Sequence, residues 1–447
     1  MKEHRFDTVV IGSGTSAYYC IDRLVSGGQK VAVVDKRPYG GTCSLRGCQP
    51  KKYLVCNAEA VAMAGHLVGN GIVEAPTTDW AALQSLKNEF LSGISEGEVK
   101  SLQDKGVATF HGDAVLTGEN EVTVGEDRLV ADHIVIASGA DPRQIEIPGK
   151  ELIHDSEYFL NMETLPKRIL FLGGGYISFE FAHVAIRAGA EVRIIHRSKQ
   201  ALKAFDPDMA KVIMEASAAE GIDVVLNEMP ESVEKGASGL EVTTSSGASY
   251  EADLVIGATG RVANLSCLSG GVGKIDHTSS GIEVNAFMQS TSNPRVYAIG
   301  DCTAGSRMLA PVADEEGKVA AQNILIGNTV EMDHSVIPSA VFTIPNIGVV
   351  GLTELQAKEK GMDIRINQGT TTGWPSSKRI GEKHSAYKVV INNADNAIVG
   401  AHLARHNAAE TINIFALAIK YGIKAHELAN FLWAYPTLTS DLKYMVK

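Results

Sequence analysis

Two cysteines five positions apart, Cys43 and Cys48, are the residues of this sequence best suited to redox chemistry. On a regular helix their Cα atoms would lie roughly 8–9 Å apart, whereas a disulfide needs about 4.4–6.8 Å. A bond between them therefore requires a distorted turn, and Gly47 supplies the freedom for one. In a cytoplasmic protein a disulfide is more often catalytic than structural. The pair thus indicates a dithiol–disulfide redox centre, the alternative being two free buried thiols.

A nucleotide-binding pattern of the form G-x-G-x-x-A stands just before the cysteines. An apolar strand beginning near Phe6 leads into it, and a helical stretch and a second strand follow. The glycines permit a sharp turn and bring backbone N–H groups to a pyrophosphate at a helix N-terminus. An acid about 20 residues further on would bind a ribose hydroxyl. We predict a first dinucleotide site formed by Gly12, Gly14, Thr15, Ser16, Ala17 and Asp35.

The pattern recurs at residues 167–196, where the candidate cofactor residues at the turn are Gly173, Gly175, Tyr176 and Ile177. The second strand here ends in His196 and Arg197, with no acid. A ribose 2′-hydroxyl favours an acid at this position, whereas a 2′-phosphate favours cations. Arg197 and Lys203 are candidate ligands of such a phosphate; the alternative is that they are solvated surface cations. The second site is therefore predicted to prefer NADPH to NADH.

Two dinucleotide sites in one chain usually belong to a flavin and a nicotinamide. Three further strand-like runs end in a glycine turn, at residues 133–143, 254–264 and 295–302. The last of them places Asp301 to bind a ribityl or ribose hydroxyl. Each run alone could be an ordinary core strand, but together with two nucleotide motifs they indicate an FAD site.

Composition and charge limit the remaining possibilities. The chain has 447 residues, of which 45% are hydrophobic and 21% charged, with a formal net charge of -11. The length suggests about three domains. The absence of a basic surplus argues against nucleic-acid and anionic-membrane partners. Six cysteines are too few for a disulfide-scaffolded secreted domain. The apolar run at the start is too short for a signal peptide, and no run approaches a membrane span, so we expect a cytoplasmic protein.

The remaining elements follow from periodicity. Residues 79–103 have a helical pattern and form an excursion between strands of the first domain. From residue 336 to the end, strand-like runs are followed by two amphipathic helical stretches, without a further G-x-G motif. This last part is predicted to be an α+β domain, of a kind that more often makes an interface than binds a nucleotide.

The chain resembles the pyridine nucleotide-disulfide oxidoreductases, the family of glutathione reductase, dihydrolipoamide dehydrogenase and mercuric reductase. The similarity includes GGTC-x4-GC-x-P-x-K, IASGADP, GGGYISFEFA, GATGRVAN, AIGD and LAPVADEEGKVAAQNI. It implies an α/β fold with two Rossmann-type domains and a C-terminal α+β dimerisation domain. The implied division is 1–147 for FAD, 148–268 for NADP, 269–333 for the rest of the FAD and central part, and 334–447 for dimerisation.

The resemblance also implies roles for individual residues. Cys48 matches the sulfur next to the flavin, and Cys43 matches the thiol that attacks the substrate. Lys52 and Glu180 match an ion pair near flavin N5, a sensible place for a cation beside a thiolate. Tyr176 matches the aromatic lid over the nicotinamide, the alternative being a packed aromatic. The resemblance adds as cofactor-binding residues Lys36, Gly41, Thr42, Lys52, Ser138, Gly139, Glu180, Gly260, Arg261, Ala310 and Pro311. It implies a homodimer, and no resident metal is predicted.

The C-terminal segment departs from the family pattern. The family has a His that is supplied by the partner subunit, followed five residues later by a Glu. Here Tyr435 and Ser440 stand in those positions, and Asp441 is one position off. An imidazole can exchange protons at neutral pH, whereas a phenol is a poor base there. Asp22 stands where glutathione reductases tend to carry an Arg for a glutathione carboxylate, and an acid there would repel that carboxylate.

These observations predict an NADPH-dependent flavoprotein that reduces a disulfide other than ordinary glutathione through Cys43 and Cys48. An alternative acceptor is a metal ion, a quinone or another oxidant, because such acceptors need little acid–base help. A third possibility is a redox-sensing flavoprotein with little turnover.

Overall fold

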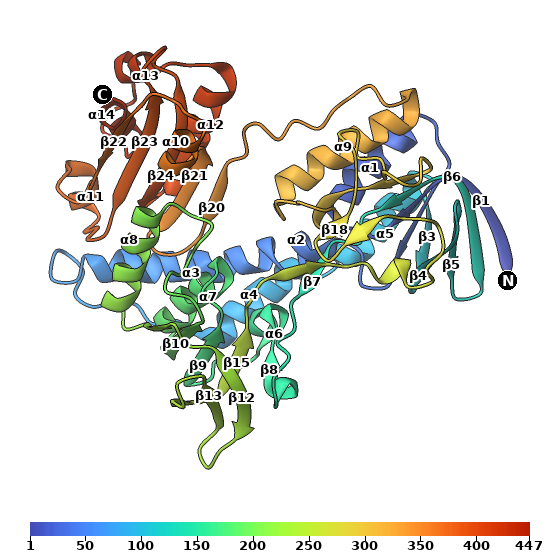
Figure 1. Ribbon diagram of the computed structural model, residues 1–447. Coiled ribbons are helices and arrows are strands. Elements are labelled where there is room, and N and C mark those ends of the chain that lie inside the picture. Colours follow the sequence, from blue (N-terminus) through green and yellow to red (C-terminus); the bar gives the residue numbers. More distant parts are fainter. The chain divides into compact units, whose positions relative to one another are not determined.

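The computed structural model describes residues 1–447 and divides into two compact units, which we treat separately (Figure 1). The first unit comprises Met1–Lys52, Leu86–Arg143 and Arg261–His334. The second comprises Tyr53–Ser85, Gln144–Gly260 and Ser335–Lys447. Helices α3 (Cys48–His66) and α4 (Trp80–Leu91) run across this division of the chain. The domain boundaries given above stay a prediction.

The first unit contains a seven-stranded sheet in the order β3-β2-β1-β6-β5-β4, with β19 also paired to β6. Its central strands are parallel and buried on both faces, since Val31, Ala32, Val33 and Val34 of β2 are at most 1% exposed. The strands are β1 (Lys2–Ile11), β2 (Val31–Asp35), β3 (Ala108–His111), β4 (Ala114–Gly118), β5 (Glu121–Val124), β6 (Asp127–Ile136) and β19 (Val296–Ala298). The predicted β-α-β arrangement around the first glycine motif is thus present, with α1 at Thr15–Ser26.

Helix α9 (Ala310–Ile326) packs beside α1, and the short helix η3 (Gly300–Cys302) contacts α9. A two-stranded ribbon of β7 (Ala140–Pro142) and β16 (Arg261–Ala263) completes the unit near the ends of the parallel strands. The helical pattern predicted for residues 79–103 forms two helices rather than one, because the chain turns at Gly93 between α4 and α5 (Ile94–Asp104).

The second unit holds a parallel sheet in the order β11-β10-β9-β15-β8. These strands are β8 (Ile153–His154), β9 (Arg168–Leu172), β10 (Glu191–His196), β11 (Asp223–Leu226) and β15 (Leu254–Gly257). Helices α6 (Ser156–Asn161), α7 (Tyr176–Arg187) and α8 (Pro207–Ala219) accompany them, with the antiparallel strands β12 (Pro230–Lys235), β13 (Leu240–Thr244) and β14 (Ser249–Ala252). This is the second predicted Rossmann-type arrangement.

The same unit contains an antiparallel sheet in the order β20-β21-β24-β23-β22, which is the predicted α+β part. Its strands are β20 (Ser339–Val341), β21 (Asn346–Gly351), β22 (Ile364–Gly369), β23 (Ala386–Asn392) and β24 (Ile398–Arg405). Its helices are α10 (Glu354–Glu359), α11 (Pro375–Arg379), α12 (Ala408–Tyr421), α13 (Ala425–Asn430) and α14 (Leu442–Met445). Helix α12 packs against β21 and β24 through Ile412 and Phe415, which are almost fully buried. None of the helices in the structure combines the length and apolar character needed to cross a membrane.

A buried carboxyl group links α9 to η3. Glu316 is 1% exposed, and its Oε2 accepts a hydrogen bond of 2.6 Å from the backbone N–H of Gly300. Burial, with a smaller contribution from the charge of Asp301, raises the pKa of Glu316 from 4.5 to about 7. The folded chain therefore binds this proton more tightly than the unfolded chain. Its contribution favours the fold below pH 4.5 and is lost as the pH rises through about 7.

Glu316→Gln should remove this pH dependence. Between pH 5.5 and pH 8, the free energy of unfolding of the wild type should fall by about 2 kcal/mol more than that of the variant. Urea unfolding of both holoproteins at the two pH values measures this difference. Equal falls in the two proteins would contradict the assignment of a raised pKa to Glu316.

Candidate functional site

The first glycine motif forms a tight cradle between β1 and α1. A Cβ atom on Gly12 would lie 2.2 Å from the carbonyl oxygen of Ala137, and one on Gly41 would lie 2.4 Å from the Cα of Gly14. Gly14 is the N-cap of α1 and has no side chain that could bind the first N–H groups of the helix. This close backbone approach and the free helix end suit a pyrophosphate.

Asp35 lies at the end of β2 and is held in a fixed orientation. Its Oδ2 accepts hydrogen bonds from the backbone N–H of Ser13, at 2.9 Å, and from the Ser13 hydroxyl, at 2.7 Å. Its Oδ1 accepts a hydrogen bond of 2.8 Å from the backbone N–H of Arg37. The carboxylate is thereby fixed beside the glycine turn, where a ribose hydroxyl can reach it.

A groove with an empty volume of about 720 Å³ runs along this edge of the sheet. Eight of the predicted cofactor-binding residues line it: Gly12, Gly14, Asp35, Lys36, Gly41, Thr42, Ser138 and Gly139. Sequence reasoning missed other lining residues: Ser13, Arg37, Arg46, Asp113, Asn264, Ser266 and Cys267. Of these, Ser13 and Asn264 had a sequence signal, since Ser13 stands inside the glycine motif and Asn264 ends the run GATGRVAN. The cradle, the fixed acid and the groove fit an FAD dinucleotide.

The other predicted FAD residues of the first unit lie on its helices and ribbon. Thr15, Ser16 and Ala17 begin α1, and Ala310 and Pro311 begin α9. The Thr15 hydroxyl donates a hydrogen bond to Asp314 of α9, which sequence reasoning did not single out. Burial raises the pKa of Asp301 in η3, and the guanidinium of Arg261 opposes that shift. Arg261 also donates a hydrogen bond to the carbonyl oxygen of Ala140.

The two redox cysteines lie on either side of a helix break. Cys43 is in α2 (Gly41–Leu45), Cys48 is the first residue of α3, and Arg46 and Gly47 separate the two helices. The two sulfurs are not bonded to each other but are in hydrogen-bond contact. The distorted turn that a bridge requires is therefore present. Lys52 lies one helical turn beyond Cys48, within α3.

The surroundings of the sulfur pair act on the pKa of Cys43. The hydrogen bond with Cys48, then burial, then the charges of Cys48 and Asp314 raise the pKa of the Cys43 thiol well above its usual range, and Lys51 opposes them weakly. Cys43 is half-buried, whereas Cys48 is exposed. A negative charge on the Cys43 sulfur is therefore disfavoured.

The second glycine motif places a histidine where many dinucleotide sites have an acid. His196 Nδ1 accepts a hydrogen bond of 3.0 Å from the backbone N–H of Gly174, and its Nε2 lies 3.0 Å from the carbonyl oxygen of Gln200. A Cβ atom on Gly174 would lie 2.6 Å from the ring, so only glycine fits there. Burial lowers the pKa of His196, and the nearby charges of Arg197 and Lys203 lower it further. Both cations are exposed and flank the strand end.

The remaining predicted residues of the second unit occupy α7 and its surroundings. Gly173 and Gly175 precede α7, whose first two residues are Tyr176 and Ile177, and Gly260 precedes β16. Tyr176 is 41% exposed, and its role as a lid over the nicotinamide stays a prediction. Glu180 is buried, and its Oε1 accepts a hydrogen bond of 2.8 Å from the backbone N–H of Phe342. The ion pair of Glu180 with Lys52 stays a prediction.

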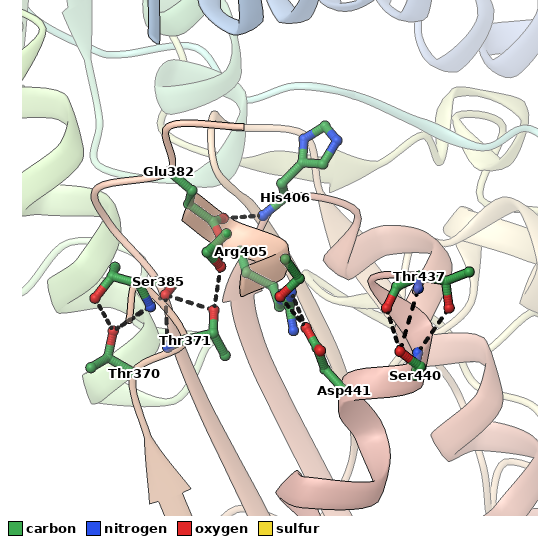
Figure 2. A network of polar contacts seen from close by, with 12 residues as sticks. Thr370, Thr371, Glu382, Ser385, Arg405, His406, Thr437, Ser440 and Asp441 are labelled. Carbon is green, nitrogen blue, oxygen red and sulfur yellow. Dashed lines mark hydrogen bonds and ion pairs between the residues drawn. The ribbon is translucent and has the colours of Figure 1, made fainter. Parts of the chain in front are cut away.

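The C-terminal tail does not rebuild an acid–base pair around Tyr435, which is 73% exposed (Figure 2 shows the tail's polar contacts). Ser440 is buried, and its hydroxyl donates a hydrogen bond of 2.6 Å to the carbonyl oxygen of Thr437 in its own turn. Asp441 Oδ2 accepts hydrogen bonds of 2.8 Å from Arg405 Nη2 and 2.6 Å from the Ser376 hydroxyl. Ser440 and Asp441 therefore hold the tail in place rather than orient the Tyr435 phenol.

Asp22 is less repulsive to an anion than the sequence suggests. Its Oδ1 lies 2.7 Å from the ammonium group of Lys105, which compensates its charge. Lys105 is 83 positions away in the chain, so no local pattern indicated this pair. The argument against glutathione from Asp22 is weaker for that reason, and the argument from Tyr435 is unaffected.

Comparison with known proteins agrees with this geometry. The family model described as pyridine nucleotide-disulphide oxidoreductase matches residues 6–317, and the model of its dimerisation domain matches residues 337–446. A glutathione reductase of Burkholderia cepacia is 31% identical over 446 residues, covering 99% of this chain and 98% of that protein. A mercuric reductase of Lysinibacillus sphaericus is 30% identical over 451 residues, covering 99% and 82%.

Among solved structures, the Cu(II) complex of the HOCl-induced flavoprotein disulfide reductase RclA from Escherichia coli has a TM-score of 0.89 and 25% sequence identity. The match covers 99% of each chain. Proteins of this family contain FAD and depend on NAD(P)H. The resemblance seen in the sequence is confirmed: the chain belongs to the pyridine nucleotide-disulphide oxidoreductase family and is a flavoprotein oxidoreductase with that family's dimerisation domain.

Proposed function

We propose that this enzyme oxidises NADPH and uses the electrons, through Cys43 and Cys48, to reduce a disulfide other than ordinary glutathione disulfide. The observation that carries the proposal is the contact between the two sulfurs at the break between α2 and α3, next to the FAD cradle. FAD, when bound, supplies the two-electron relay between the nicotinamide and the sulfur pair. The choice of electron acceptor depends on Cys43, Cys48 and the residues around them.

The two cysteines divide the work of thiol–disulfide exchange. Cys43 loses its proton and attacks one sulfur of the substrate disulfide, which releases the first substrate thiolate and leaves a mixed disulfide on Cys43. Cys48 then attacks Cys43, which releases the second substrate thiolate and re-forms the Cys43–Cys48 disulfide. Two electrons thus move from the sulfur pair to the substrate, and the two released thiolates take up protons from the enzyme or from solvent, or leave as anions. The raised pKa of Cys43 makes removal of its proton the demanding part of this sequence.

The absence of an imidazole at position 435 shapes the choice of substrate. A leaving thiolate of an alkyl disulfide needs a proton, whereas an acidic thiol leaves readily as its anion. Tyr435 can donate a proton but is a poor base at neutral pH. The site therefore favours disulfides whose thiols are acidic, and it disfavours ordinary glutathione disulfide.

We further propose that the active enzyme is a homodimer in which the Tyr435 segment completes the site of the partner. The family's dimerisation domain supports this arrangement. Large apolar side chains are exposed on α12 and on the segment after α13, as expected of a surface that a partner covers: Leu417, Tyr421, Phe431, Leu432 and Tyr435.

A metal ion is the second candidate acceptor. One solved structure of the E. coli reductase is a Cu(II) complex, and several relatives are mercuric reductases. Electron transfer to a metal ion needs thiolate ligands but no acid–base imidazole, so Tyr435 is no obstacle to it. This candidate keeps the same sulfur pair and changes only the acceptor.

Cys43→Ser tests the proposed function. NADPH oxidation should be at least about 100-fold slower in the variant with any disulfide acceptor, because the attacking thiolate is lost. The wild type should prefer an aryl disulfide, such as 5,5′-dithiobis(2-nitrobenzoate), to oxidised glutathione. Turnover of Cu(II) without turnover of any disulfide would contradict the disulfide proposal and favour the metal ion. Cys56→Ser, an exposed cysteine of α3 outside the pair, is the matched control and should keep wild-type rates.

The nicotinamide preference tests the assignment of Arg197 and Lys203. The specificity constant for NADPH should exceed that for NADH by at least about 10-fold, and Arg197→Ala should remove most of the difference by raising the KM for NADPH alone. Steady-state kinetics with both coenzymes and one fixed acceptor measure it. Equal specificity constants in the wild type would show that these cations are solvated surface charges.

Tyr435→His tests whether the missing base limits disulfide reduction. A positioned imidazole should accelerate single-turnover reoxidation of the reduced enzyme by oxidised glutathione by about 10-fold or more. Tyr435→Phe removes the hydroxyl and keeps the aromatic ring. It should slow the same step only if the phenol donates a proton. If Tyr435→His is no faster than the wild type with any alkyl disulfide, acid–base help at this position does not limit the reaction.

A further inference from the structure

Lys388 of β23 is a buried cation held by carboxylates near the second dinucleotide motif. Its side chain is 6% exposed, and its ammonium lies 3.1 Å and 3.0 Å from the two carboxylate oxygens of Asp206. Asp208 Oδ2 lies 2.6 Å away, and Glu354 Oε2 lies 3.9 Å away. Asp206 is itself only 2% exposed. A buried pair of this kind is costly to break, because either partner alone would leave an uncompensated charge.

Asp206 ends the segment that carries the two candidate phosphate ligands. Residues 197–206 connect β10 to α8, and they include Arg197 and Lys203. Asp206 is the N-cap of α8, since its side chain accepts a hydrogen bond from the backbone N–H of Asp208. Lys388 therefore fixes the C-terminal end of this segment to β23, 182 positions away in the chain.

The rest of the segment is tied to the glycine turn. The His196 ring joins the backbone N–H of Gly174 to the carbonyl oxygen of Gln200. The backbone N–H of Leu202 donates a hydrogen bond of 2.8 Å to the carbonyl oxygen of Gly174, and Leu202 is buried with a φ of 51°. A left-handed leucine costs free energy, and it persists only where its surroundings hold it. Arg197 and Lys203 thus project from a segment anchored at both ends.

We propose that Lys388 is a positioning residue for the 2′-phosphate of NADPH. Through Asp206 it fixes the segment that presents Arg197 and Lys203, and it does not touch the coenzyme. The inference rests on the NADPH preference proposed above. Loss of the tie should weaken binding of the phosphorylated coenzyme and leave binding of the unphosphorylated coenzyme almost unchanged, because only the former uses the two cations.

Calorimetric binding of NADP⁺ and NAD⁺ to the oxidised holoenzyme tests this without an acceptor substrate. Lys388→Met should weaken NADP⁺ binding by about 10-fold and NAD⁺ binding by less than about twofold. Lys388→Arg retains the cation and should restore most of the NADP⁺ affinity. Because Lys388→Met leaves Asp206 buried and unpaired, it is compared with the double variant Lys388→Met/Asp206→Asn. The double variant keeps the net charge of the cluster and an N-cap residue but loses the ion-pair tie.

The double variant separates two explanations of a weaker NADP⁺ affinity in Lys388→Met. One is loss of the ion pair that positions residues 197–206, and the other is the uncompensated charge of Asp206. If it also loses NADP⁺ affinity selectively, the tie itself positions the segment. If it binds NADP⁺ as well as the wild type does, the inference is overturned. Arg168→Met is the matched control, because Arg168 is paired with Glu251 and Asp253 at the start of β9, the end of the strand away from the glycine turn. A selective loss of NADP⁺ affinity in this control would also overturn the inference.

Failure of the proposed coenzyme preference would look different. In that case the wild type would bind NADP⁺ and NAD⁺ equally, and Arg197→Ala would change neither affinity. The other outcome has three parts: the wild type binds NADP⁺ more tightly than NAD⁺, Arg197→Ala abolishes this preference, and the Lys388 variants keep it. In that case the coenzyme preference stands and only the positioning role of Lys388 fails. The substrate disulfide enters none of these measurements.

Discussion

The proposed function depends on one interaction, the contact between the sulfurs of Cys43 and Cys48. A continuous helix would hold the two residues too far apart, so α2 has to end and α3 has to begin between them. The same segment starts at Gly41, whose approach to Gly14 closes the FAD cradle. A single stretch of chain thus brings the flavin site and the sulfur pair together.

The electrostatics of this pair explain why the tail residue matters. The surroundings of Cys43, the sulfur proposed to attack the substrate, raise the pKa of its thiol, so a group that accepts its proton would help the attack. Relatives of the glutathione reductase type use an imidazole for this purpose, and here the position holds an exposed phenol. The tail is nevertheless well anchored, through Asp441 and Arg405. The structure therefore has a firmly held tail that presents an exposed phenol, and not an imidazole, at this position.

The local arrangement of the fold could be predicted from the sequence, because its signals are local. Each glycine motif lies with its two flanking strands within about 30 residues, the span of one β-α-β unit, and so does the acid at the end of β2 with the first motif. Contacts between distant segments could not be predicted in this way. The pairs Asp206–Lys388, Asp22–Lys105 and Thr15–Asp314 join residues that no periodicity connects. Glu316 likewise looks like an ordinary surface acid of an amphipathic helix until the fold buries it.

Anaerobic titration of the oxidised holoenzyme with NADPH, followed by alkylation and mass spectrometry, tests the central claim most directly. If Cys43 and Cys48 accept electrons from NADPH, the wild type should consume two equivalents, and both cysteines should become alkylated only after the titration. Cys43→Ser should consume one equivalent. Consumption of one equivalent by the wild type, with the alkylation of Cys43 and Cys48 unchanged by NADPH, would contradict the account.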